Sequence, residues 1–256
     1  MAKIFCVANQ KGGVGKTTTT VNLAAGLAML KQRVLLVDLD PQGNATMGAG
    51  INKATLTASI YEVLLGMSDV KTARLTSDTG KFDVLPANRE LAGAEVEMVE
   101  LERRETRLKD ALATVADDYD FVLIDCPPAL SMLTLNGLCA ANGVIIPMQC
   151  EYYALEGLSD LVNTIKKVHA NLNPDLKIIG LLRVMFDPRM TLSQQVSAQL
   201  EQHFGDKVFK TIIPRNVRLA EAPSYGVPGV CFDAASKGAQ AYINFGAEMV
   251  ERIKTI

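Results

Sequence analysis

Several residue types that often carry chemistry are scarce in this sequence. Tryptophan is absent, histidine occurs twice, and the five cysteines are scattered with no Cys-x-x-Cys spacing. Neither His169 nor His203 has a histidine, cysteine or carboxylate at metal-ligand spacing, so we expect both on the surface. The cysteine pattern disfavours an iron–sulfur carrier. It predicts reduced, mostly buried thiols, as in a cytosolic protein.

Long apolar runs and an excess of one charge are also missing. No signal peptide and no stretch of about 18 apolar residues occurs, so we expect no membrane span and a cytoplasmic protein. The 26 Lys and Arg residues nearly balance 28 Asp and Glu residues, giving a formal net charge of −2 and a pI near 5.8. This balance argues against bulk attraction to nucleic acid, so any DNA contact requires a local patch.

The chain is nevertheless long enough to bury a large core. Its 256 residues are 48% hydrophobic with a mean hydropathy of +0.15. We therefore predict one α/β domain over residues 1–256 rather than two domains. Short apolar runs ending in acidic or turn-forming residues predict a mostly parallel, twisted sheet with helices on both faces.

The stretch 8–18 combines a strand end, a glycine-rich turn and a helix start. It follows the apolar run 4–7 and precedes the apolar segment 21–30. Glycines let the backbone curl around an anion, and the helix N-terminus adds the positive end of its dipole. Lys16 has the position of a charge on the β- and γ-phosphates, and the Thr17 hydroxyl that of a Mg²⁺ ligand. The predicted phosphate-binding residues are Lys11, Gly12, Gly13, Val14, Gly15, Lys16, Thr17 and Thr18.

A second lysine distinguishes this turn from the common G-x-x-x-x-G-K-[ST] spacing. Gln10 occupies the first glycine position, and Lys11 follows it. Two lysines at close range repel each other. Placing both beside one phosphate site is favourable only if the bound group carries more negative charge than one such site normally neutralises. No Asp or Glu precedes Asp38 in the chain. We therefore favour a phosphate-directed Lys11 over a solvent-facing loop charge.

Two further apolar runs end in carboxylates. Residues 33–38 end at Asp38, with Asp40 in the following turn-rich loop, and residues 120–125 end at Asp125 before two prolines. The carboxyl ends of parallel strands meet at one edge of a sheet, so these acids are expected beside the phosphate site. Asp125 has the position of a residue that holds a magnesium-bound water. A turn-forming role before proline stays possible for one of Asp38 and Asp40.

The segment Lys11-Gly12-Gly13-Val14-Gly15-Lys16-Thr17 resembles the deviant Walker A motif of the ParA/MinD group of P-loop ATPases. Later stretches, including 150–157, resemble specifically the ParA/Soj partitioning ATPases, and the similarity covers essentially the whole chain. The resemblance implies a P-loop NTPase fold with ATP and Mg²⁺ as cofactors. It implies that Lys11 reaches the nucleotide of a partner subunit, so that the catalytic residues are Lys11, Lys16 and Asp40. Asp40 would orient or activate the attacking water, and the metal site would comprise Thr17, Asp38 and Asp125.

The resemblance also assigns contacts in the second half of the chain. The segment 214–216 matches residues that surround the adenine, and the predicted nucleotide-binding residues there are Met185, Pro214 and Asn216. Arg189 and Arg218 match arginines that touch DNA phosphates. Ordinary surface ion pairs are the alternative for these two side chains.

Other features of this half are less determined. Between residues 183 and 218, six basic and three acidic residues leave an excess of three positive charges. The sequence departs from the usual family pattern at Arg183, Met190 and Thr191. The role of Glu151 stays open among a dimer-interface contact, a ribose contact and helix N-capping.

Hydrophobic patterns predict the remaining elements. The expected strands are 82–86, 144–148, 177–185 and 208–213; the expected helices are 59–65, 101–116, 130–140, 158–168, 192–204 and 237–256; and 214–223 is expected to be a loop. The first strand begins at about residue 3, which leaves no room for the N-terminal helix-turn-helix that some family members carry. The basic amphipathic tail with which MinD-like relatives lie on membranes is also missing.

These inferences together predict an Mg-ATPase that acts as a switch. Its ATP-bound homodimer would bind double-stranded DNA non-specifically, and a ParB-like partner would stimulate slow hydrolysis during chromosome or plasmid segregation on the nucleoid. Three alternatives remain. The same ATPase could position a protein cargo on the nucleoid, or a MinD-like protein could act at a membrane surface. A small-molecule ligase such as a dethiobiotin synthetase would need an acceptor motif, and none is found.

Overall fold

A central sheet organises the computed structural model, which describes residues 2–255. Among these residues the sheet has eight strands in the order β3-β4-β2-β5-β1-β6-β7-β8. All neighbouring strands run parallel except the edge pair β3–β4, which is antiparallel. The strands are β1 (Lys3–Val7), β2 (Val34–Asp38), β3 (Leu75–Thr76), β4 (Asp83–Leu85), β5 (Phe121–Asp125), β6 (Gly143–Met148), β7 (Lys177–Phe186) and β8 (Val208–Pro214). The predicted α/β fold with a mostly parallel sheet is confirmed.

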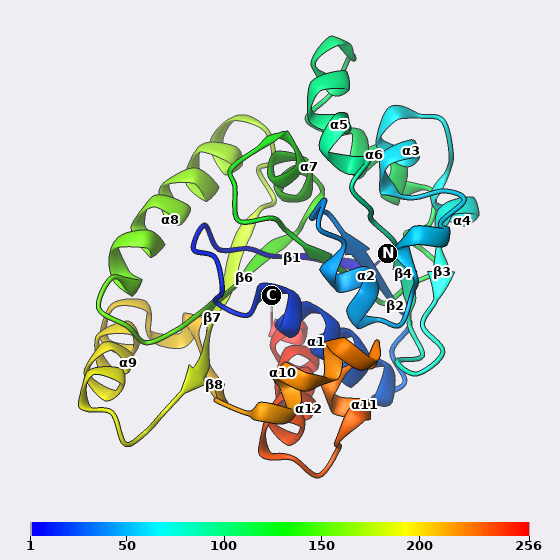
Figure 1. The fold of residues 1–256 in the computed structure, drawn as a ribbon. Helices are drawn as coiled ribbons and strands as arrows, with labels where there is room; N and C mark the ends of the chain where they lie inside the picture. The colour runs from blue at the N-terminus through cyan, green and yellow to red at the C-terminus, as the bar shows by residue number, and fades with distance from the viewer. Residues whose placement is uncertain (1, 256) are drawn as a thin grey trace.

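Helices cover both faces of the sheet (Figure 1). The longer ones are α1 (Lys16–Met29), α7 (Met132–Ala140), α8 (Ala154–Asn171), α9 (Thr191–Phe204) and α12 (Lys237–Arg252). The shorter ones are α2 (Asn44–Gly48), α3 (Ile60–Leu65), α4 (Val70–Ala73), α5 (Leu91–Glu97), α6 (Arg107–Ala113), α10 (Val217–Glu221) and α11 (Gly229–Phe232). In β1, Phe5 and Val7 pack into the core that holds α1 and α12, whereas Cys6 packs into the core of α7 and α8. Side chains that alternate along the strand therefore pack into two separate cores, one on each face of the sheet, which explains why the central strands are apolar throughout.

The strand register brings three chain segments to one point. Val7 of β1 is level with Asp125 of β5, and Asp125 is level with Asp38 of β2. The glycine-rich turn begins directly after Val7, at Ala8. The parallel topology thus places two strand-end carboxylates beside the turn, as ligand sites of open α/β sheets require.

Helix α1, which begins at the end of the glycine-rich turn, is anchored by α12. The two helices approach closely at Gly26, where an added Cβ would lie 3.3 Å from the carbonyl oxygen of Tyr242. The buried hydroxyl groups of Thr19 and Tyr242 lie 3.0 Å apart and share a hydrogen bond. The expected helix over 237–256 is observed to Arg252 and packs on α1 as well as on β8; Ile256 lies outside the described residues.

Three sequence-based boundaries were wrong. The helix expected over 158–168 is longer at both ends, because α8 runs from Ala154 to Asn171. The helix expected over 101–116 is observed only as α6, because Arg103 adopts a left-handed conformation with φ 54° and the carbonyl of Arg104 accepts a hydrogen bond from the Asn136 side chain. The alternating charges before α6 therefore lie on a turn. The segment expected to be a loop over 214–223 contains α10, whose N-cap is Asn216.

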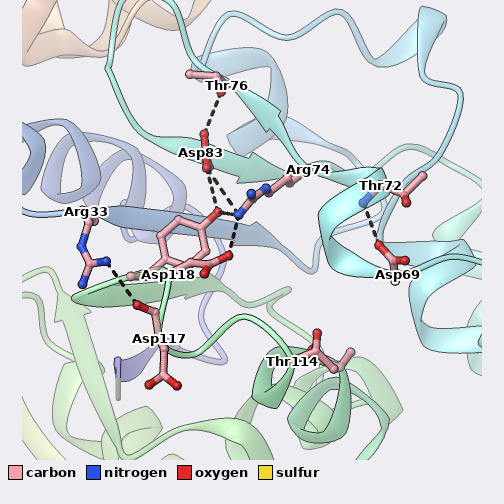
Figure 2. A network of polar contacts seen from close by, with 11 residues as sticks. Arg33, Asp69, Thr72, Arg74, Thr76, Asp83, Thr114, Asp117 and Asp118 are labelled. Carbon is pink, nitrogen blue, oxygen red and sulfur yellow. Dashed lines mark hydrogen bonds and ion pairs between the residues drawn. The ribbon is translucent and has the colours of Figure 1, made fainter.

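A polar network ties the β3–β4 edge to the start of β5 (Figure 2). The Tyr119 hydroxyl donates to Asp83 Oδ2 at 2.7 Å and accepts from the Arg74 guanidinium at 2.6 Å. Thr76 donates to the other oxygen of Asp83, and Arg74 also contacts Asp118 at 3.3 Å. The network lies at the amino ends of β4 and β5, away from the strand-end carboxylates, so we assign it a structural role.

The structure also bears on the cysteines and on the hydropathy of the helices. All five cysteines are free, four of them buried and Cys231 half-buried, as predicted. Across residues 2–255, no helix combines the length and hydropathy that crossing a membrane would require.

Candidate active site

The glycine-rich turn brings backbone N–H groups and the buried Lys16 amine together at the start of α1. Gly13 and Gly15 have φ angles of 72° and 75°, a conformation that side chains disfavour. Gly15 is also the N-cap of α1 and provides no side-chain hydrogen bond, so the first N–H groups of the helix stay available to an anion. The Lys16 amine is largely buried and donates to the Lys11 carbonyl at 3.1 Å. Burial lowers the pKa of Lys16, and the nearby Asp125 charge opposes that effect.

Asp125 is held by two threonines of α1. Its Oδ2 accepts from the Thr17 hydroxyl at 2.7 Å and its Oδ1 from the Thr20 hydroxyl at 3.1 Å. The carboxyl group is fully buried, and burial, with the neighbouring Asp38 charge, raises its pKa to about 8. The sequence reasoning missed Thr20, although its place in the first turn after the glycines was a usable signal.

Asp38 organises the loop that carries Asp40. Its Oδ2 accepts from both the backbone N–H and the hydroxyl of Thr46, each at 2.8 Å, and its Oδ1 accepts from the Asp40 N–H at 3.1 Å. Burial raises the pKa of Asp38 to about 6, and the Thr46 hydrogen bonds oppose the shift. The Thr46 hydroxyl also accepts from the Ala87 N–H at 2.9 Å. Thr46 is a second site residue that the sequence reasoning missed.

Asp40 itself is half-buried, and its Oδ1 accepts from the Gln42 N–H at 2.9 Å. This bond closes a turn of the kind aspartate forms two residues ahead, so the turn-forming interpretation holds for Asp40 in this state.

The donor set fits a hydrated magnesium ion. Among residues 2–255, no group of three or more His, Cys, Asp or Glu side chains could hold a metal ion by itself. Mg²⁺ takes few protein ligands and keeps waters and substrate phosphates in its octahedron. One hydroxyl, Thr17, and two buried carboxylates, Asp38 and Asp125, beside an anion cradle match that requirement.

The residues expected around the base share one small pocket. Met185, Pro214 and Asn216 line a cavity of about 100 Å³ together with Gly15 and Thr18 of the glycine-rich turn. The turn therefore meets the predicted base-binding residues directly.

Met185 has an unusual conformation for a methionine, with φ 50°. Gln149 lies beside it: its amide nitrogen is 3.1 Å from Met185 Sδ and 3.3 Å from the Gly13 carbonyl oxygen. Gln149 thus connects the two halves of the site, and the sequence reasoning did not find it.

Lys11 pairs within its own chain. Its amine lies 2.6 Å from Glu151 Oε2, with 43% and 50% of the two side chains exposed. Helix α8 begins at Ala154 with Tyr153 as its N-cap, so N-capping by Glu151 was a wrong interpretation. Although no acidic residue precedes Asp38 in the sequence, the fold brings Glu151 to the glycine-rich turn.

The two arginines expected to contact DNA are exposed and ion-paired. Arg189, 87% exposed, makes two hydrogen bonds to Asp187 at 2.7 and 2.9 Å, and they lower the pKa of Asp187 to about 2. Arg218 lies 3.0 Å from Glu221 and 3.5 Å from Asp233. The surface ion-pair alternative therefore describes both residues in this state, and their DNA contacts stay predictions.

Arg183 does not belong to the surface charge that the sequence suggested. It is buried, and its guanidinium donates to Ser197, to Glu201 and, at 2.8 Å, to the Phe209 carbonyl. It links β7, α9 and β8 from the inside. The local surface excess of positive charge is thus smaller by one than the sequence indicated.

Comparison with known proteins extends these observations. A family model described as an AAA domain matches residues 2–178. The sporulation initiation inhibitor protein Soj of Bacillus subtilis is 52% identical over 249 residues, covering 97% of this chain and 98% of that protein. The chromosome partitioning protein ParA of Myxococcus xanthus is 50% identical over 252 residues, covering 98% and 89%.

A solved structure agrees over the whole chain. A protein from Mycobacterium smegmatis, described as cobyrinic acid a,c-diamide synthase with bound ATP analogue and magnesium, superposes with a TM-score of 0.87 at 41% identity, covering 99% of this chain and 96% of that one. The chain therefore belongs to the ParA/Soj family of partitioning P-loop ATPases, which use ATP with magnesium.

Proposed function

We propose that this protein is an ATP-dependent dimerising switch that binds double-stranded DNA non-specifically and segregates a chromosome or plasmid with a ParB-like partner. The observation that carries the proposal is the meeting, at one sheet edge, of the glycine-rich turn, Lys16, Thr17 and two buried carboxylates, in a chain about half identical to Soj and ParA proteins. We further propose that residues 1–256 form one ATPase domain that works in the cytoplasm on the nucleoid.

Each part of the site has a defined task in this proposal. The backbone N–H groups of residues 12–16 and the Lys16 amine bind the triphosphate. Thr17 and Asp125 would hold a hydrated magnesium ion, which would neutralise charge on the phosphate oxygens. Asp38 supports the ion's waters and fixes the Asp40 backbone. The Asp40 carboxylate orients the attacking water and accepts its proton.

Dimerisation makes the switch. Lys11 is exposed and lies at the rim of the phosphate cradle, from which it reaches the phosphates of a second subunit. ATP can favour the dimer only through contacts that the monomer lacks, and by linkage the dimer then binds ATP more tightly. Hydrolysis weakens those contacts and returns the protein to monomers.

Two copies also make a weak DNA-binding surface useful. Arg189 and Arg218 are each paired with a carboxylate, so a DNA phosphate has to compete with Asp187 or Glu221. One subunit therefore binds weakly, whereas a dimer doubles the contacts in a single complex. The binding should depend steeply on salt and little on sequence.

Related ATPases suggest alternative functions. The same DNA-bound switch could carry a protein assembly, because the partner chooses the cargo. A MinD-like protein would act on a membrane surface. Amide synthesis is a further alternative, because the Mycobacterium smegmatis protein is described as a diamide synthase. That reaction needs an acceptor held near the γ-phosphate.

Measuring ATP turnover with random duplex DNA, with anionic liposomes and with neither separates these functions. Stimulation by DNA supports the proposal, whereas stimulation by liposomes alone would indicate a membrane ATPase. Turnover that required a carboxylic acid and an amine donor would indicate a synthase. Lys16→Ala should abolish turnover, and Lys71→Ala, which removes an exposed lysine on α4, should not. A Lys16→Ala protein with full activity would refute the phosphate cradle.

A further inference from the structure

The segment between β6 and α8 forms a second wall beside the glycine-rich turn. Gln149 donates to the Gly13 carbonyl at 3.3 Å, and two residues later Glu151 accepts from Lys11 at 2.6 Å. These contacts join residues 136 and 140 positions apart in the chain. The conformation of the turn and that of this segment are therefore coupled in the free subunit.

The two lysines of the turn are held differently. The Lys16 amine is largely buried and its hydrogen bond goes to a carbonyl oxygen, and no carboxylate of the described residues 2–255 forms an ion pair with it. The Lys11 amine is partly exposed and bonded to the Glu151 carboxylate. Lys16 is therefore ready for an anion in its own subunit, whereas the charge of Lys11 is already neutralised.

An uncovered aromatic pair follows Glu151 directly. Tyr152 and Tyr153 are 75% and 68% exposed, and their rings meet edge-to-face with centroids 5.0 Å apart. Aromatic side chains are enriched in protein–protein interfaces. Their place beside Lys11, continuous with the proposed dimer contact, makes a second copy of this chain the occupant that fits them.

We propose that Glu151 is a latch, a positioning residue that holds Lys11 inside its own subunit until a second ATP-bound subunit arrives. The inference rests on the proposed ATP-dependent dimer. On association Lys11 exchanges the Glu151 carboxylate for the phosphates of the partner subunit, and the second copy covers Tyr152 and Tyr153. A triphosphate carries more negative charge than a diphosphate, so it displaces Glu151 more readily. The latch therefore weakens dimerisation by the free energy needed to separate Lys11 from Glu151, and only a nucleotide that attracts Lys11 strongly enough meets that cost.

The dimer dissociation constant with magnesium and a non-hydrolysable ATP analogue, measured by sedimentation velocity, tests the latch. Glu151→Gln should tighten the dimer by up to about five-fold per subunit at low salt, the range expected from losing one exposed ion pair in each subunit. The gain should shrink at high salt because such pairs are screened. With ADP in place of the analogue, the gain in dimer affinity should be no larger. Asp160→Asn, which removes an exposed charge on the following helix α8, is the matched control and should change neither dimer constant.

A double-mutant cycle shows whether Glu151 acts through Lys11. In a Lys11→Gln background, Glu151→Gln should have no effect on the dimer, and Glu151→Ala provides a second variant with the same expectation. A dimer that is unchanged or weakened by Glu151→Gln, or strengthened equally without Lys11, overturns the latch alone. A wild-type protein that stays monomeric with the analogue overturns the proposed dimer, and the latch with it.

Discussion

Replacing Thr46 by valine tests whether the hydrogen bonds seen here hold Asp38 in place. Thr46 is fully buried, and its hydroxyl donates to Asp38 Oδ2 at 2.8 Å while accepting from the Ala87 N–H at 2.9 Å. Valine has nearly the same shape but offers neither interaction. The substitution therefore removes one hydrogen bond to a carboxyl group and leaves one buried N–H without a partner.

The expected cost follows from those two losses. A hydrogen bond to a charged group contributes about 1.5–3 kcal/mol, and an unsatisfied buried N–H costs about 1–3 kcal/mol. Asp38 keeps its bonds from two backbone N–H groups, so we take about 3 kcal/mol of unfolding free energy as the expected loss. For a chain of this length that corresponds to a fall in Tm of roughly 6–12 °C.

Urea unfolding of the nucleotide-free protein measures this loss. Thr134→Val is the matched control, because Thr134 is a buried threonine whose hydroxyl makes one hydrogen bond, to the Ala129 carbonyl. Its expected cost is about 1 kcal/mol. The Thr46→Val loss should be larger at pH 8, where Asp38 is ionised, than at pH 5, where it is protonated. A loss below that of Thr134→Val, or one independent of pH, would refute the reasoning.

Three other expectations concern charge. Burial raises the pKa of Asp38 to about 6 and that of Asp125 to about 8, above the ordinary value of about 4. The metal-free protein therefore loses stability as pH rises from about 4 to about 8, so its Tm should fall over that range and level off above it, and Asp125→Asn should flatten the profile. Asp187→Asn frees Arg189 and should strengthen DNA binding. In filter-binding assays the dependence of log affinity on log salt concentration should become steeper by up to about one per subunit. An unchanged slope would mean that Arg189 does not contact DNA and is only a surface ion pair. Arg183→Ala should cost about 2–4 kcal/mol in urea unfolding, because buried hydrogen bonds are lost, and a cost below 1 kcal/mol would contradict that role.

The sequence reasoning succeeded where function depends on local pattern. Glycines at 12, 13 and 15 and a lysine at the helix start predict a phosphate cradle without reference to the rest of the chain, and Gly13 and Gly15 have the left-handed φ angles that favour glycine. Asp38 and Asp125 could be placed at one edge because apolar runs predict parallel strands, whose carboxyl ends meet there. The register that levels these two residues with Val7 agrees with that expectation.

Tertiary structure decided which distant side chains meet and which charges are buried. The Lys11–Glu151 contact joins residues 140 positions apart, and Arg183, a charge in a strand pattern, is buried because α9 and β8 supply its acceptors. The helix expected over 101–116 begins only at Arg107, because the Arg104 carbonyl before it accepts a hydrogen bond from Asn136 of another helix. Local propensity is worth only tenths of a kcal/mol per residue, whereas a buried hydrogen bond from a packed neighbour is worth about 1 kcal/mol or more. The chain itself therefore determined the cradle and the fold class, and packing between remote elements determined the partners of its charged residues.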